Sequence, residues 1–170
     1  MKYQVREKLF SFTDDFTIKN EYDESIFNVR GKFLSLGHKL NLEDLNGNSL
    51  YYIEQKLLRF LPEYYIYDSK GNQAAKIKKQ FTFFKPKFII ESNYGYYELN
   101  GNIFDHDFEI TKNNSICAVI SKKWFSLSCT YGIDIDENED HAFILSLIIV
   151  LDKVMDDQQS NSAMLPSSDL

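Results

Sequence analysis

The chain has 170 residues, of which 44% are hydrophobic and 26% charged, with a formal net charge of −6. This length and composition fit one globular domain with a sizeable core and exclude a disordered or collagen-like chain. Two cysteines, Cys117 and Cys129, are too few for a disulfide framework, and we expect both to be buried structural thiols. No charged-then-apolar leader opens the chain, so we expect a cytoplasmic protein.

Short runs of alternating apolar and polar residues, punctuated by turn residues, extend from the N-terminus to about residue 136. This pattern is typical of half-buried strands. The predicted strands include residues 16–18, 26–29, 50–57, 64–67, 74–79, 87–91, 96–99, 108–111 and 125–135. We expect about twelve strands in all, which favours an antiparallel sandwich or barrel over a parallel α/β sheet.

Four pairs of residues predict the tips of hairpins between these strands. Asn46-Gly47 and Asn100-Gly101 tolerate the positive φ angles that tight hairpins demand. Lys70-Gly71 and Asn113-Asn114 are similar but weaker signals.

Residues 141–151 break the strand pattern, because ten uncharged and almost wholly apolar residues follow His141. We expect a helix over about 139–157 that is apolar on every side; a strand buried on both faces is the alternative. Ten helical residues span about 15 Å and a bilayer about 30 Å, so no transmembrane segment is expected. Acidic residues suit the helix N-terminus, where Asp136 and Glu139 resemble a capping box.

A helix that is apolar all round has to be enclosed by protein, and in this chain the enclosure has to be sheet. A closed barrel of about twelve strands has a lumen wide enough for a helix. The sequence therefore predicts a mainly β fold, in which residues 1–157 form a single domain: a closed antiparallel β-barrel around a hydrophobic C-terminal α-helix. We expect residues 158–170 to form a polar tail. The predicted helix core comprises Phe143, Ile144, Leu147, Ile148 and Leu151.

The order and spacing of several segments resemble the LURP-one-related family, which is related to the tubby C-terminal domain and the phospholipid scramblases. The similar segments are 27–31, 35–37, 45–50, 65–71, 75–79, 87–90, 101–103, 108–110, 118–125 and 131–135, within a match that covers about 5–157. The resemblance implies a tubby-like fold, a twelve-stranded barrel wrapped around a hydrophobic C-terminal helix. Tubby domains hold phosphoinositide headgroups with basic residues, and scramblases transport lipids. We do not carry over lipid scrambling, because the terminal helix here is short and ends in charged residues.

The charge is unevenly distributed along the chain. Residues 56–87 hold eight basic and two acidic residues, whereas residues 134–157 hold eight acidic residues and one lysine. Both segments are consistent with solvated surfaces. The basic segment is also the best candidate site: Lys56, Lys76, Lys78 and Lys79 are predicted to bind an anion. Alternation puts Lys76 and Lys78 on one strand face and leaves Lys79 out of phase, which implies a bulge or a barrel rim.

No other pattern predicts a reaction centre. The glycines form neither a dinucleotide fingerprint nor a phosphate-binding loop, and the three histidines, His38, His106 and His141, lack metal-site spacing and are expected to be ordinary surface or loop residues. Residues 134–140 lack the glycine and glutamate of an EF-hand loop, although a looser cation site stays open. We therefore expect no catalytic residues, no metal and no cofactor.

The sequence favours a non-enzymatic intracellular module with a binding or regulatory role, cytoplasmic or peripheral at a membrane. Its ligand is expected to be an anionic lipid headgroup or a phosphorylated metabolite, and nucleic acid is not expected because the chain is acidic overall. One alternative is a protein-interaction scaffold whose acidic residues 134–140 meet a basic partner. Another is an uncharacterised enzyme with a pocket lined by His106 and carboxylates.

Overall fold

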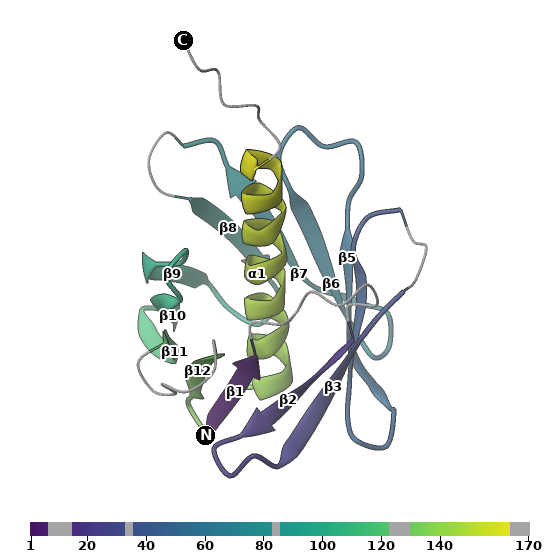
Figure 1. Ribbon diagram of the computed structural model, residues 1–170, viewed down its shortest axis with the longest axis vertical. Coiled ribbons are helices and arrows are strands. Elements are labelled where there is room, and N and C mark those ends of the chain that lie inside the picture. Colours follow the sequence, from purple (N-terminus) through teal and green to yellow (C-terminus); the bar gives the residue numbers. More distant parts are fainter. Residues whose placement is uncertain (7–14, 33–35, 83–85, 123–129, 164–170) are drawn as a thin grey trace.

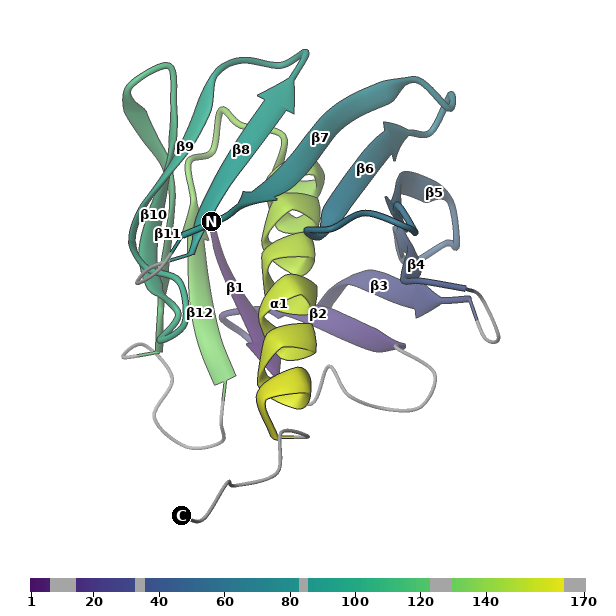
Figure 2. The ribbon, with the colours of Figure 1, turned by 90° about the horizontal axis from the view of Figure 1, so that it is seen from above.

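Residues 1–6, 15–32, 36–82, 86–122 and 130–163 are described by a computed structural model of the chain. Within them, twelve strands close into one antiparallel barrel, and helix α1 (His141–Ala163) runs through it (Figures 1 and 2). The strands are β1 (Lys2–Arg6), β2 (Phe16–Asn20), β3 (Ser25–Gly31), β4 (Lys39–Glu43), β5 (Ser49–Gln55), β6 (Glu63–Asp68), β7 (Gln73–Gln80), β8 (Lys87–Ser92), β9 (Tyr97–Asn102), β10 (Asp107–Lys112), β11 (Ser115–Ser121) and β12 (Thr130–Ile135). Consecutive strands pair with each other, and β1 closes the barrel against β12. The predicted fold class is confirmed.

Some strand boundaries differ from those predicted. β1, β4 and β11 are strands that the alternation did not single out, and β5 ends at Gln55 rather than at residue 57. The predicted strand 125–135 is observed from Thr130 onward, and residues 125–129 lie outside the described residues.

Three of the four predicted hairpin tips are confirmed. Asn46-Gly47 lies in the β4–β5 turn, Lys70-Gly71 in the β6–β7 turn and Asn113-Asn114 in the β10–β11 turn, each with positive φ. The prediction for Asn100-Gly101 is wrong, because both residues belong to β9 and the turn to β10 comprises residues 103–106. Gly101 also has a positive φ, of +123°. Glycine is required here because a Cβ at this position would lie 2.7 Å from the carbonyl oxygen of Asp107.

Helix α1 is enclosed by the barrel, since every residue from 142 to 155 is buried. The five residues predicted as its core are at most 1% exposed. Asp140 caps the helix, because its Oδ1 accepts a hydrogen bond of 2.9 Å from the Phe143 N–H, whereas Asp136 accepts from Asn138 within its own turn. The helix extends through residues 158–163, which were predicted to belong to the polar tail.

The two ends of the barrel are built differently. Because neighbouring strands are antiparallel, alternate connections lie at the same end. The turn end holds residues 21–24, 44–48, 69–72, 93–96 and 113–114, together with the start of α1. The loop end holds residues 32, 36–38, 56–62, 81–82, 86 and 103–106, together with the last turns of α1.

Candidate functional site

The candidate site predicted from sequence centres on β7, where Lys76 and Lys78 alternate with buried residues. Both lysines therefore lie on the outer face of the barrel. Lys56, which follows β5, approaches the same face. The Nζ atoms of Lys56 and Lys76 lie 5.2 and 5.5 Å from the centre of the Tyr65 ring, within the range of a cation–π interaction. The structure thus brings these two lysines together around one tyrosine.

Glutamates partly neutralise this cluster. Lys76 Nζ lies 3.9 Å from Glu63 and 4.0 Å from Glu91, and Lys56 Nζ lies 3.7 Å from Glu54. Lys78, in contrast, forms no ion pair with any described residue. Lys56 is 41% exposed, so water screens its ion pair. Lys56 and Lys78 are therefore the lysines of this face most available to an external anion.

Lys79 differs from the other three lysines. The β7–β8 register continues past it without interruption, so there is no bulge here, and Lys79 lies one residue from the end of β7. Its backbone N–H donates a 3.1 Å hydrogen bond to the Pro62 carbonyl, which ties β7 to the β5–β6 loop. Partial burial lowers the pKa of its ammonium group. Lys79 therefore occupies the rim of the barrel at the loop end.

Next to this rim, the β5–β6 loop exposes large apolar side chains. Leu58, between the cations Lys56 and Arg59 in the sequence, is fully exposed, and Phe60, which follows Arg59, is 93% exposed. Leu58 also has a φ of +58°, which is uncommon for a branched aliphatic residue. Phe81, just beyond β7, is 66% exposed at the same end. Apolar side chains of this size gathered on one surface are typical of an interaction site.

The sequence analysis missed Leu58, Arg59 and Phe60. The strand predicted over 50–57 included the first two residues of the loop, because β5 ends at Gln55. The exposure of the remaining apolar side chains cannot be predicted from their hydrophobicity alone. A detectable signal was present in residues 56–62, where Lys56 and Arg59 alternate with pairs of apolar residues before Pro62. That spacing has neither the period of two of a strand nor a helical period.

Comparison with known proteins decides the family. The sequence pattern of the LURP-one-related family matches residues 1–152. The chain belongs to this family. Its relatives include the "Uncharacterized protein YxjI" of Bacillus subtilis (strain 168), which is 35% identical over 158 residues, 93% of this chain and 96% of that protein. A solved structure of a protein from Arabidopsis thaliana has 17% identity and a TM-score of 0.64 over 90% of this chain and 89% of the other, a likeness of fold.

The histidines of this LURP-one-related protein make more contacts than ordinary surface residues. His106 Nε2 lies 3.2 Å from Asp152 of α1, and Tyr131 donates a hydrogen bond to the same carboxylate. His38 Nε2 lies 3.0 Å from Asp157, and His141 is hydrogen-bonded to Tyr3. His38 and His106 lie in loops, as predicted, and their side chains also contact α1. Each histidine joins the helix to the barrel wall or to its rim.

The acidic segment 134–140 of this family member has partners within the protein. Lys112 Nζ lies 2.6 Å from Glu139, and Tyr51 donates a 2.6 Å hydrogen bond to Asp140. Asp134 accepts a hydrogen bond from the N-terminal amine of Met1. These contacts support the role of the segment at the helix N-terminus, and we build neither a cation site nor a scaffold surface on it. The described helices include none that is both long and apolar enough to span a bilayer.

Cys117 is buried, as predicted, and Cys129 lies outside the described residues. Burial raises the pKa of the Cys117 thiol from 9.0 to about 11. At pH 8 the native protein should therefore hold roughly a hundredth of the thiolate that the unfolded chain holds. Alkylation of Cys117 by iodoacetamide, measured by mass spectrometry of its peptide, should be at least that much slower in buffer than in urea. Equal rates would show that the thiol is accessible.

Proposed function

We propose that the protein is a non-enzymatic binding module that docks peripherally on anionic membranes through the loop end of its barrel. The observation that carries this proposal is the exposure of Leu58 and Phe60 in one loop with the cations Lys56 and Arg59. Apolar side chains can enter the interface of a bilayer while neighbouring cations contact the phosphates above it.

The energies favour a membrane over a free metabolite. Burying a large apolar side chain is worth about 1.5–3 kcal/mol when it is complete, and a basic residue near an anionic surface contributes about 1 kcal/mol. Lys56, Arg59 and Lys78 supply charge for headgroups, and Leu58, Phe60 and Phe81 supply the apolar area. A phosphorylated metabolite would use the same cations but would leave the apolar side chains in water.

Vesicle flotation tests this proposal. The wild-type protein should float with vesicles of phosphatidylserine and phosphatidylcholine at modest salt and remain behind with pure phosphatidylcholine. Replacing two lysines, K56A/K78A, should weaken binding about thirtyfold, because two contacts of about 1 kcal/mol are lost. The apolar double variant L58S/F60S should weaken it at least tenfold.

The matched control changes the same residue types at the turn end, where Leu45 and Lys70 are exposed. The variant L45S/K70A should bind like the wild type. The membrane proposal fails if neutral and anionic vesicles bind equally, or if L58S/F60S has no effect. Tight binding of soluble glycerophosphoserine, measured by calorimetry and unchanged in L58S/F60S, would instead identify a small-molecule site.

A further inference from the structure

Among the described strands, β8 and β9 are the neighbours with the fewest backbone pairs, and we call the gap between them the seam. Within the described residues these strands share a single backbone pair, Ile90 with Tyr97, whereas β7 and β8 share six. Continuing that register would align residues 89, 88 and 87 of β8 with residues 98, 99 and 100 of β9. These positions are not paired, so two strand edges face each other with unused backbone N–H and C=O groups.

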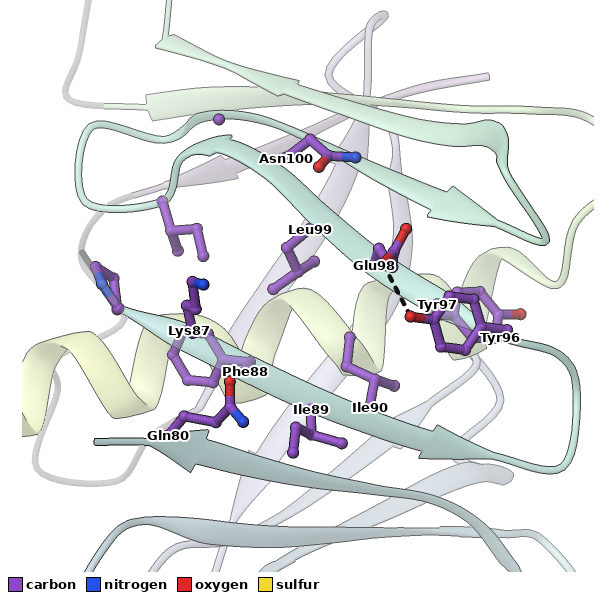
Figure 3. A pocket seen from close by; sticks show the side chains of 13 residues that line it. Gln80, Lys87, Phe88, Ile89, Ile90, Tyr96, Tyr97, Glu98, Leu99 and Asn100 are labelled. Carbon is purple, nitrogen blue, oxygen red and sulfur yellow. Dashed lines mark hydrogen bonds between the residues drawn. The ribbon is translucent and has the colours of Figure 1, made fainter. Parts of the chain in front are cut away.

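The seam opens into a cavity of about 520 Å³. Figure 3 shows Lys87 and Leu99 between the two strands, which approach each other near Ile90 and Tyr97 and diverge toward Lys87 and Asn100. Helix α1 passes behind the opening. The inner side is apolar, since Phe88 and Leu99 pack against the core. The outer side carries exposed Lys87 and Ile89 on β8 and exposed Glu98 and Asn100 on β9.

We propose that this seam binds an extended peptide segment as an added strand. Unpaired strand edges are the usual acceptors of such a segment, because its backbone satisfies their hydrogen bonds. An acyl chain would fill the apolar side and leave these backbone groups without partners. The three unpaired positions on each strand span about 10 Å, which is room for a segment of three strand residues.

The side chains of β8 and β9 that border the seam indicate which residue types the bound peptide should carry. Alternation places Lys87 and Glu98 outward and Phe88 and Leu99 inward. A strand between them therefore carries an acidic residue beside Lys87, then an apolar residue facing Phe88 and Leu99, then a basic residue beside Glu98. Neither Lys87 nor Glu98 forms an ion pair with a described residue, although Glu98 accepts a 2.9 Å hydrogen bond from the Tyr96 hydroxyl. Because β8 and β9 are antiparallel, the segment runs parallel to one of them and antiparallel to the other.

Selection from a random decapeptide display library tests the proposal on the full chain. Enriched peptides should contain the triplet acidic–apolar–basic, in either direction. A selected peptide, synthesised and measured by calorimetry, should bind K87E about tenfold more weakly, since an attraction becomes a repulsion. The control K70E makes the same charge change at an exposed hairpin tip and should bind like the wild type.

Amide hydrogen exchange locates the bound peptide without any mutation. Residues 87–89 and 98–100 should exchange faster than β6 and β7 in the free protein and slow down when the peptide binds. The proposal is overturned if no peptide is enriched, if binding is unchanged in K87E, or if the peptide protects another region. It is also overturned if phosphatidylcholine vesicles, rather than peptides, protect the seam. None of these outcomes depends on L58S/F60S, so this proposal and the membrane proposal fail separately.

Discussion

Replacing Ile148 by aspartate should leave the protein unable to fold. Ile148 is 1% exposed in the middle of α1, where every neighbour along the helix from 142 to 155 is also buried. A carboxylate there has no solvent and no partner prepared for it. We expect I148D to cost about 5 kcal/mol or more, comparable to the whole free energy of unfolding of a small domain. Far-UV circular dichroism and size-exclusion chromatography should show loss of the folded state.

The control I116D introduces the same side chain on the outer face of β11, where Ile116 is 53% exposed. It should change the free energy of unfolding by less than about 1 kcal/mol in urea titrations. A milder change, I148A, should still fold, with a loss of about 2–5 kcal/mol. If I148D were as stable as I116D, the helix could not occupy the interior of the barrel.

The architecture could be predicted because it depends on local signals. The alternation of apolar residues identifies most strands. The ten almost wholly apolar residues that follow His141 form a helix that has to be enclosed by the rest of the protein. Of the missing strands, β1 and β4 do alternate but are only five residues long. In β11 the alternation is interrupted: Cys117 and Ala118 are adjacent and both buried, and a register shift lies between Ile110 and Thr111 in the β10–β11 pairing.

The candidate site could be predicted only in part, because its geometry depends on contacts between distant residues. The charge count pointed to Lys56 and Lys76, but not to the way in which Glu54 and Glu63 neutralise them. The loop end is assembled from connections far apart in the chain, so that Phe60 and Phe81 share a surface only after the barrel closes. Hydrophobicity predicts burial on average, and Leu58 and Phe60 are exceptions. The proposed membrane surface depends on these two exceptions.

The seam could not be predicted for a similar reason. Residues 87–91 and 96–99 have the apolar content of strands, and nothing in their sequence shows that they pair at one position only. The separation follows from the three-dimensional course of β8 and β9. It places the seam in the barrel wall, with its wide end toward the loop end that carries the proposed membrane surface.

Replacing Gly101 by alanine should destabilise the protein far more than the same change at Gly71. Both glycines have positive φ, +123° and +83°, but a Cβ at Gly71 would meet no atom within 4 Å. At Gly101 it would lie 2.7 Å from the Asp107 carbonyl oxygen and 2.8 Å from the Phe108 Cα, both backbone atoms of the paired strand. We therefore expect G71A to cost about 1–2 kcal/mol for the backbone conformation.

G101A should add about 1–3 kcal/mol of overpacking to that conformational cost, because β10 has to move away from β9. Urea titrations of the two variants measure the difference directly. If the two variants were equally stable, Gly101 would be a turn glycine like Gly71, and β9 would end before it. A larger loss in G101A would show that the glycine is required by the close approach of two paired strands. Its place in the strand would then follow from packing across the β9–β10 pair rather than from the turn chemistry of an Asn-Gly sequence.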